Sequence, residues 1–262
     1  AGGGVASESA VGTEGAETPE SAISGGAEQG GGNGEGAGKF EAADNDEQSG
    51  GSGGKGGVES ISIRTGREAQ RAVILGRTGS GKSVAAKNFI AAADRVVVWD
   101  IRRQHSNSGH VLNSLPALTE GISWSEFRLI YQPVTLTEEE FGAVCLTVYR
   151  EGNMLFVVEE ADTFATPAYI NDDFNRCITW GRMRGLGVIC ISRRPANLHK
   201  NCLSEMNHLL LYHVHLPNDT IYLKQFVPPD AVEEAKTLHV GEFVYWNGQT
   251  SWHRHSPLLL LR

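Results

Sequence analysis

Residues 76 to 83 read Gly-Arg-Thr-Gly-Ser-Gly-Lys-Ser, a complete phosphate-binding loop pattern. Glycines let backbone N–H groups wrap phosphate oxygens at a helix N-terminus, where amide donors lack partners within the helix. In this pattern Lys82 reaches the β- and γ-phosphates and the hydroxyl of Ser83 ligates Mg²⁺. The pattern predicts a site for ATP and Mg²⁺ built from Gly76, Arg77, Thr78, Gly79, Ser80, Gly81, Lys82, Ser83 and Val84.

The segments on either side of this loop decide whether the match is meaningful. The apolar run Ala72-Val73-Ile74-Leu75 precedes it, and the helix-like stretch from Val84 to Ile90 follows it. A chance match in a chain with 32 glycines is the alternative. The order of strand, loop and helix argues against chance, because the phosphate site requires that order.

A second group of chemically competent residues follows the apolar run Met154 to Val158, where two acids stand side by side. The first, Glu159, is predicted to hold the Mg²⁺ shell, and the second, Glu160, to orient and deprotonate the attacking water. An acidic surface turn is the alternative. Glu159 stands where aspartate is more usual, so its contact with the metal could run through water, or the register could be off by one. The second acid favours hydrolysis over phosphoryl transfer to another substrate.

The elements that must position these residues alternate between strand and helix. Apolar, β-branched runs predict strands at 72–75, 95–100, 126–131, 154–158, 187–191 and 208–214, with helices between them. A capping box at Thr137 to Glu140 opens a helix that runs to about Arg150. The pattern predicts an α/β fold of the additional-strand P-loop class, with a mostly parallel sheet flanked by helices. Residues 242–246 and 258–261 are expected to form antiparallel edge strands.

Two further sets of residues flank the strand at 187–191. Ser192 and Arg193 follow it, where the middle strand of such an ATPase carries a polar sensor for the γ-phosphate. Arg182 and Arg184 precede it, at the opposite edge of the sheet, so they could reach only a neighbouring subunit's ATP. They are candidates for an arginine finger supplied in trans. Ordinary surface arginines or salt-bridge partners are the alternative.

The motifs GRTGSGKS, VVVWD, FVVEEAD, GRMRGLGV, ISRRPANLHK and LPNDTIYLKQFV together resemble those of the FtsK/HerA superfamily of ring-forming DNA-pumping ATPases. The compact viral genome-packaging ATPases are the most similar branch, and the resemblance spans about residues 68 to 247. It implies Lys82 and Ser83 for ATP and Mg²⁺, Glu159 and Glu160 as the acidic pair, and Arg182 or Arg184 as the trans finger. The family usually has glutamine where Arg193 stands, which leaves Ser192 as the alternative sensor.

Composition divides the chain into a tail, residues 1–57, and a motor domain, residues 58–262. The tail holds 19 of the 32 glycines and carries the whole net charge of −8, so the domain is neutral. Such a stretch cannot bury a core and is predicted to be disordered, either as a solvating extension or as a docking segment for capsid or membrane vertex proteins. We expect reduced thiols at the four cysteines and neither a signal peptide nor a transmembrane segment. The expected location is the host cytoplasm or the virion.

A neutral domain argues against a static DNA binder, because phosphate neutralisation needs a basic excess. A ring of about six subunits, each with one or two cations in the pore, could still form a positive channel. The candidate pore cations are Arg102, Arg103 and His105, with a solvated loop as the alternative. His208, His213, His215, His253 and His255 make a metal site geometrically possible, although no partner stands at ligand spacing. The aromatic residues are interpreted as core or interface.

These observations predict an oligomeric, Mg²⁺-dependent ATPase that translocates double-stranded DNA, most simply a genome-packaging motor. Two alternatives remain open. One is a nucleotide-gated assembly or morphogenesis factor that moves no DNA, and the other is a cellular HerA-like translocase.

Overall fold

The computed structural model describes residues 37–40, 61–249 and 251–260. Its main feature is a nine-stranded sheet in the order β13-β12-β11-β3-β10-β7-β4-β6-β5. All pairings from β11 to β5 are parallel, and β12 and β13 add antiparallel strands at one side. The strands are β3 (Arg71–Leu75), β4 (Arg95–Trp99), β5 (His110–Leu112), β6 (Phe127–Tyr131), β7 (Leu155–Val158), β10 (Gly187–Ser192), β11 (His208–Leu211), β12 (Phe243–Trp246) and β13 (Trp252–His255).

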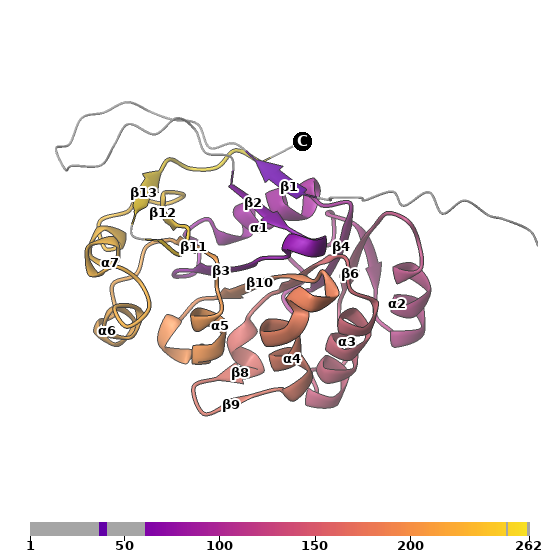
Figure 1. Ribbon diagram of the computed structural model, residues 1–262. Helices are drawn as coiled ribbons and strands as arrows, with labels where there is room; N and C mark the ends of the chain where they lie inside the picture. Colours follow the sequence, from indigo (N-terminus) through magenta and orange to yellow (C-terminus); the bar gives the residue numbers. More distant parts are fainter. Residues whose placement is uncertain (1–36, 41–60, 250, 261–262) are drawn as a thin grey trace, which may run out of the picture. The chain divides into compact units, whose positions relative to one another are not determined.

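Helices cover both faces of this sheet, because every parallel connection must cross over it. In Figure 1, α1 lies on one side of the sheet, and α2, α3, α4 and α5 lie on the other. The helices are α1 (Lys82–Ala92), α2 (Leu115–Ile122), α3 (Glu138–Glu151), α4 (Asp172–Trp180), α5 (Lys200–Ser204), α6 (Pro217–Leu223) and α7 (Pro229–Ala235). Short 3-10 turns are η1 (Gly66–Glu68), η2 (Ala161–Thr163), η3 (Gly181–Arg184) and η4 (Pro195–Asn197).

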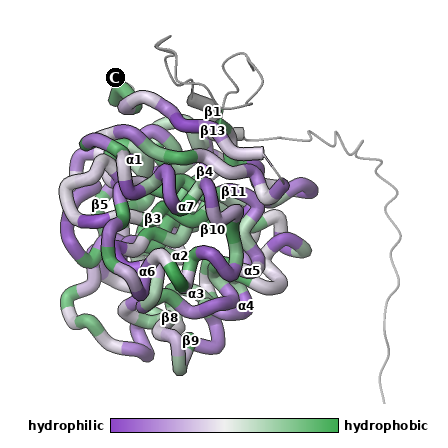
Figure 2. The backbone as a smooth tube through the Cα atoms, turned by 90° about the vertical axis from the view of Figure 1, so that its left-hand side faces the viewer, coloured by the Kyte–Doolittle hydropathy of each residue, from purple (hydrophilic) through white to green (hydrophobic). Residues whose placement is uncertain are grey.

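The core is split in two by the sheet, since alternate residues of each strand face opposite sides. Val73 and Leu75 of β3 belong to the larger apolar cluster, which includes residues of α2 to α7. Ala72 and Ile74 belong to the smaller cluster under α1, which also takes up Ile61 and Ile63. Figure 2 shows the hydrophobic strands enclosed by more polar helices. The central strands are therefore buried on both faces, as their unbroken apolar runs predict.

The position of β10 between β3 and β7 confirms the predicted additional-strand arrangement. This order brings the ends of β3, β7 and β10 together at one edge of the sheet. We call the edge where the parallel strands end the carboxyl edge, and the edge where they begin the amino edge. The P-loop follows β3 and the acidic pair follows β7, so both lie at the carboxyl edge, where ligands of α/β sheets gather.

Local signals explain the best-predicted helix. Thr137 accepts a hydrogen bond on its side-chain oxygen from the backbone N–H of Glu140 at 3.2 Å, as the capping box predicts. Gly152 follows the helix with a φ of 68°, a backbone conformation that favours glycine. The predicted helix from Thr137 to Arg150 is confirmed to within a residue.

Some predicted elements are corrected by the structure. The last antiparallel strand is β13, Trp252–His255, and the predicted strand at 258–261 is wrong over 258–260, while residue 261 lies outside the described residues. Leu258 instead packs into the smaller core cluster outside any strand. Four further strands were not predicted: β2 (Ile61–Arg64), β5, and the two-residue strands β8 (Ala165–Thr166) and β9 (Tyr169–Ile170). These strands are too short for a periodicity to show.

Only four residues of the predicted tail fall within the described residues. Ala37–Phe40 form β1, which pairs antiparallel with β2. The prediction of disorder does not fit these four residues, since a backbone partner orders them. The rest of the predicted tail lies outside the described residues, so its disorder and its docking role stay predictions. In the described part of the chain, every helix falls short of the length and apolarity needed to cross a bilayer.

Candidate nucleotide-binding site

The P-loop connects β3 to α1 and rests on Tyr212, one of the aromatic residues interpreted above as core or interface. Gly76 and Gly81 have φ values of 143° and 117°. A Cβ at Gly76 would lie 2.6 Å from Cβ of Tyr212, and one at Gly81 would lie 2.9 Å from its ring. Tyr212 directly follows β11 and is fully buried. Two of the glycines are therefore required by close packing on this tyrosine as well as by the phosphate-binding conformation.

Lys82 is held over the loop by two of its carbonyls. Its Nζ donates to the carbonyl oxygens of Gly76 at 2.7 Å and Arg77 at 3.0 Å. Burial lowers the pKa of the ammonium group, and the nearby carboxylates of Glu159 and Glu160 oppose that shift. Two of the three ammonium N–H donors are thus paired within the loop that phosphates would fill.

The predicted magnesium ligands lie in one pocket. Lys82, Ser83, Glu159 and Glu160 line a cavity of about 140 Å³ together with Thr78, Gly79, Arg102, Gln104, Ile191, Ser192 and Arg193. Ser83 Oγ donates to Gln104 Oε1 at 2.6 Å, and Glu159 Oε1 lies 2.7 Å from His105 Nε2. A hydroxyl and a carboxylate oxygen are ligands that Mg²⁺ prefers. The residues therefore fit the metal that the motif implies.

Glu160 has an unusual backbone and two cationic partners. Its φ of 51° places it in the left-handed region at the start of η2. Arg193 Nε donates to its Oε2 at 2.8 Å, and Arg102 Nε lies 3.4 Å from its Oε1. A left-handed non-glycine residue at the end of a buried strand is typical of a functional turn. The strand end thus presents Glu160 to the pocket with both carboxylate oxygens engaged.

The loop after β4 is pinned by a buried carboxylate. Asp100 accepts hydrogen bonds from the backbone N–H groups of Gln104 and His105, both at 2.9 Å, and from the Gln132 side chain at 3.0 Å. His105 is completely buried and faces Glu159. The prediction of His105 as a pore cation is therefore wrong for this residue, because its ring is enclosed. Arg102 and Arg103 are exposed, as that prediction requires.

Of the predicted sensor residues, Ser192 ends β10 and Arg193 follows it, and both line the same pocket. Ser192 Oγ accepts from the backbone N–H of Arg194 at 3.2 Å, which shapes the turn. Burial raises the pKa of Asp162, and the nearby hydroxyl of Ser192 opposes that rise. The chain thus brings Ser192 and Arg193 together with the P-loop and the acidic pair.

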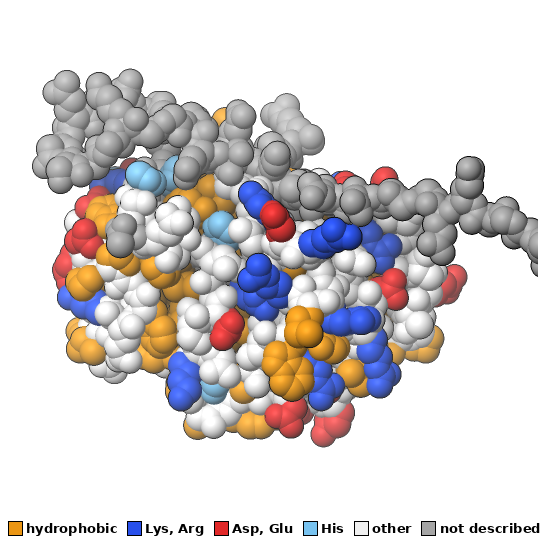
Figure 3. Space-filling model, in the orientation of Figure 1, with side chains coloured by type: hydrophobic (Ala, Val, Ile, Leu, Met, Phe, Trp, Pro, Cys, Tyr) orange, Lys and Arg blue, Asp and Glu red, His pale blue; other side chains and the backbone are white. Residues whose placement is uncertain are grey.

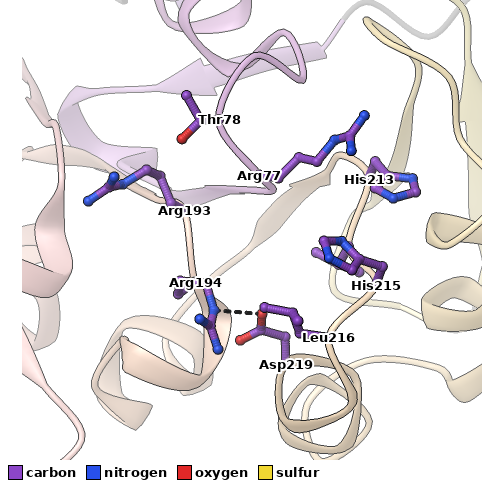
Figure 4. A pocket seen from close by; sticks show the side chains of 9 residues that line it. Arg77, Thr78, Arg193, Arg194, His213, His215, Leu216 and Asp219 are labelled. Carbon is purple, nitrogen blue, oxygen red and sulfur yellow. Dashed lines mark hydrogen bonds and ion pairs between the residues drawn. The ribbon is translucent and has the colours of Figure 1, made fainter.

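A larger cavity of about 480 Å³ adjoins this pocket and shares Thr78 and Arg193 with it. Figure 4 shows Arg77 reaching toward His213, with His215 beside it, while Arg193 points the other way. Arg194 Nε donates to Asp219 Oδ2 at 2.9 Å. The predicted Pro217-Asn218-Asp219 motif therefore supports the turn after β10, because its acid anchors Arg194 and the N–H of Ala196.

The two candidate finger arginines lie at the amino edge and differ in their contacts. Arg184 donates to the carbonyl oxygens of Tyr149, at 3.2 Å, and Arg150, so it caps the C-terminus of α3. Arg182 is exposed on η3 between Trp180 and Met183, which are 58% and 86% exposed. Figure 3 shows hydrophobic side chains beside cationic ones on this face. Both arginines are exposed, and the guanidinium group of Arg184 is tied to the end of α3.

The histidines do not assemble into a metal site. Among the described residues, no group of three or more His, Cys, Asp or Glu side chains could hold a metal ion. His208 Nδ1 lies 2.8 Å from the hydroxyl of Tyr245, and the rings of His213 and His215 are 5.6 Å apart. The four cysteines are buried as free thiols, as predicted.

The comparisons with known proteins agree with the nucleotide-binding site that the geometry indicates. No family model matches the chain. DNA double-strand break repair helicase HerA of Pyrococcus furiosus is 31% identical over 97 residues, which are 35% of this chain and only 18% of HerA. DNA packaging ATPase P9 of Enterobacteria phage PRD1 is 24% identical over 182 residues, 65% of this chain and 75% of P9.

Solved structures share the fold. The genome packaging NTPase B204 from Sulfolobus turreted icosahedral virus 2, in complex with AMP, has a TM-score of 0.62 and 21% identity, over 72% of this chain and 98% of B204. B204 was also solved with ATPγS and with AMPPCP. The pCW3 conjugation coupling protein TcpA has a TM-score of 0.51 and 12% identity, over 84% of this chain and 65% of TcpA. The fold predicted from the sequence is confirmed.

Together these matches confirm the resemblance that the motifs predict. The chain is similar to P-loop ATPases of the FtsK/HerA type, including viral genome-packaging ATPases.

Proposed function

We propose that this chain, with its likeness to FtsK/HerA-type ATPases, is an ATPase of the packaging and translocase class. In this proposal it works as a ring-shaped homo-oligomer and moves double-stranded DNA into a virus shell. The packaging roles of P9 and B204 support this assignment, and nucleotide complexes of B204 support a nucleotide site. One observation carries the proposal: the P-loop lysine, the two adjacent acids and the tip of β10 line a single pocket.

The chemistry assigned to this pocket is hydrolysis of the γ-phosphate. Lys82 would leave the carbonyls of Gly76 and Arg77 and donate to the β- and γ-phosphates, whose charge also favours its protonated form. Ser83 and Glu159 would hold Mg²⁺, which supplies charge neutralisation at the phosphate oxygens. Glu160 would accept a proton from the water that attacks the γ-phosphorus, and ADP would leave. Ser192 and Arg193, at the tip of β10, would contact the γ-phosphate.

The proposal includes an oligomer because Arg182, a proposed part of the site, lies at the amino edge, whereas the pocket lies at the carboxyl edge. Arg182 lies at the amino edge, far along the strand from the pocket, and could act only on a neighbour's ATP. An arginine supplied in trans stabilises the charge that builds up on the transferred phosphoryl group. The exposed side chains of Trp180 and Met183 beside it fit a surface that a second copy covers.

DNA would be contacted by the exposed cations of the loop after β4. Arg102 and Arg103 stand at its tip, and the domain as a whole is neutral. In a ring, each subunit contributes a few such cations, and together they form a positively charged channel. Weak contacts suit a motor that must release the DNA at each step.

The test is steady-state ATP hydrolysis by the purified chain with and without double-stranded DNA, beside the variant Glu160→Gln. We expect DNA to stimulate hydrolysis, and the variant to bind ATP while hydrolysing it at least about 10²-fold more slowly. Hydrolysis that is indifferent to DNA would contradict translocation and support the assembly-factor alternative. Full activity in Glu160→Gln would contradict the assignment of the catalytic base.

A further inference from the structure

A second cavity lies beside the catalytic pocket, and the hydrolysis assigned to that pocket makes no use of it. The cavity holds about 480 Å³ and the pocket about 140 Å³, and Thr78 and Arg193 line both. One water molecule takes up roughly 30 Å³ of liquid, so the cavity has room for a small hydrated anion. Because the two spaces share these residues, an anion formed in the pocket can pass into the cavity.

The charges around the two spaces differ. The catalytic pocket sets two carboxylates, Glu159 and Glu160, against its cations. Among the described residues, Asp219 is the only acid that lines the cavity, whose other charged side chains are arginines and histidines. The two oxygens of Asp219 already accept from Arg194 Nε at 2.9 Å and from the N–H of Ala196 at 3.1 Å. The cavity therefore has the larger excess of positive charge and attracts an anion more strongly.

Three side chains of the cavity are suited to a phosphate. Figure 4 shows Arg77 reaching toward His213, with His215 beside it. The backbone N–H of Arg77 donates to the carbonyl of His213 at 3.2 Å, which ties the P-loop to the loop after β11. The two imidazole rings lie 5.6 Å apart. A guanidinium group binds two phosphate oxygens at once, which leaves the remaining oxygens for the imidazoles.

The hydrogen bond of His213 favours a phosphate that carries a hydroxyl group. Its Nδ1 lies 3.1 Å from the carbonyl oxygen of Leu238, and because a carbonyl oxygen only accepts, Nδ1 carries the proton. In the neutral ring Nε2 is then an acceptor. Inorganic phosphate has an O–H group at neutral pH that donates to such an acceptor, whereas a phosphodiester of DNA has none. The ring thus matches free phosphate better than a nucleic-acid backbone.

We propose that this cavity is a binding site for inorganic phosphate, with Arg77, His213 and His215 as its ligands. The inference rests on the proposed function and adds the route by which its product leaves. Water adds its oxygen to the γ-phosphorus, the bond to the bridging oxygen breaks, and the products are ADP, phosphate and a proton that Glu160 takes up. The phosphate then passes Thr78 into the cavity while ADP is still bound in the P-loop. Phosphate therefore leaves before ADP.

The first experiment titrates inorganic phosphate into the full-length chain by isothermal titration calorimetry, with Mg²⁺ and a saturating non-hydrolysable ATP analogue. The analogue fills the γ-phosphate position, so only a separate site can take phosphate, and we expect one phosphate per chain. His215→Ala and Arg77→Ala should each weaken its binding about five- to tenfold, because each loses a hydrogen bond to a charged group. The matched control is His110→Ala, which removes an exposed histidine from β5, at the other end of the sheet, and should leave phosphate binding unchanged.

A second readout follows the release of the product. In a single turnover, chemical quench measures cleavage of ATP, and a fluorescent phosphate sensor measures phosphate that has left the protein. We expect the delay between cleavage and release to lengthen about two- to fivefold in His215→Ala, because the phosphate loses a partner along its route. His215 is exposed, so its replacement leaves the core intact. A merely structural role for His215 would slow cleavage and release together and would leave the delay as it is.

The outcomes separate the two proposals. A chain that binds no nucleotide analogue contradicts the proposed function and this inference with it. A chain that binds the analogue but no phosphate, or whose His215→Ala and Arg77→Ala variants bind phosphate as tightly as the unaltered chain, contradicts the phosphate site alone. Phosphate that competes with the analogue would show that the cavity holds part of the nucleotide instead. Weaker binding of a DNA duplex to His215→Ala, with unchanged phosphate binding, would assign the cavity to the DNA backbone.

Discussion

The two edges of the central sheet use arginine in opposite ways. At the carboxyl edge, Arg102 and Arg193 face the carboxylate of Glu160 and remain about half exposed. At the amino edge, arginines donate to backbone carbonyls at the ends of helices. Arg71 reaches the end of α4, Arg95 the end of α2, Arg128 the end of α1 and Arg184 the end of α3.

The amino-edge pattern has a simple physical origin. In a parallel α/β sheet every crossover helix runs against the strands, so its last carbonyls collect at the edge where the strands begin. Those carbonyls lack partners within the helix and carry the negative end of the helix dipole. The guanidinium group of an arginine donates hydrogen bonds to these carbonyl oxygens directly. The residues of this edge therefore contribute to stability, whereas those of the other edge are free to exchange partners.

Arg182 is exposed at the amino edge, and its replacement should have the largest effect. We expect Arg182→Ala to lower ATP hydrolysis by about 10³-fold, because an arginine in trans stabilises the transition state in this enzyme class. Arg184→Ala, two residues away, should instead lower the melting temperature, with a much smaller loss of hydrolysis. Steady-state hydrolysis and thermal unfolding of both variants measure this difference.

Mixing variants adds a control for the trans assignment. Arg182→Ala subunits retain Glu160, and Glu160→Gln subunits retain Arg182. In a mixed ring, a site with Glu160 can lie beside a subunit with Arg182, so mixed rings should regain part of the activity. A mixture as inactive as its components, or an Arg182→Ala variant within about tenfold of the unaltered chain, would contradict a finger at this position.

His208 should make the amino edge sensitive to pH. Burial, with a further contribution from nearby Arg64, lowers the pKa of this histidine to about 4. An unfolded histidine takes up its proton near pH 6.5, so between about pH 6.5 and 4 the unfolded state holds more protons. Stability conferred by the neutral ring is complete above pH 6.5 and is lost as the pH falls toward 4, by about 3 kcal/mol in total.

Comparison with His208→Gln isolates this contribution from other acid-sensitive groups. We expect the difference in the free energy of unfolding between the two proteins to change steadily from pH 7 to pH 4, as measured by urea denaturation. A constant difference over that range would show that His208 does not titrate with folding.

Replacement of Arg71 should have the smallest effect of these changes, and it separates the roles of the two edges most clearly. Its side chain is buried and donates to the carbonyls of Ile178 at 2.5 Å and Thr179 at 3.3 Å. We expect Arg71→Ala to cost about 2 kcal/mol, a fall in melting temperature of about 4–8 °C for a domain of this size, through the carbonyls left without a donor. ATP hydrolysis at 20 °C should stay unchanged. A large loss of activity in folded Arg71→Ala would break the division between the edges.

The sequence predicted the elements whose signal is local. The P-loop, the strands β3, β4, β7 and β10, and the helix after Thr137 were found because a buried parallel strand is an unbroken apolar run and a capping box is a four-residue pattern. The strand β5 was missed because it has three residues and only Leu112 is buried.

Contacts between segments that are distant along the chain could not be predicted from the sequence. His105 looks like a loop cation, and only the fold brings it against Glu159, 54 residues away. Arg184 looks like a finger candidate until α3 is placed beside it. Tyr212 was interpreted only as a core or interface residue, and its packing on the glycines of the P-loop is visible only once β11 is placed beside β3.

Displacement of a third strand from a DNA triplex tests the central claim most directly, because only a protein that moves along the duplex removes the third strand. We predict ATP-dependent displacement by the unaltered chain, and none by Glu160→Gln or with a non-hydrolysable analogue. DNA-stimulated hydrolysis without any displacement would contradict the claim that the carboxyl edge of this sheet drives translocation.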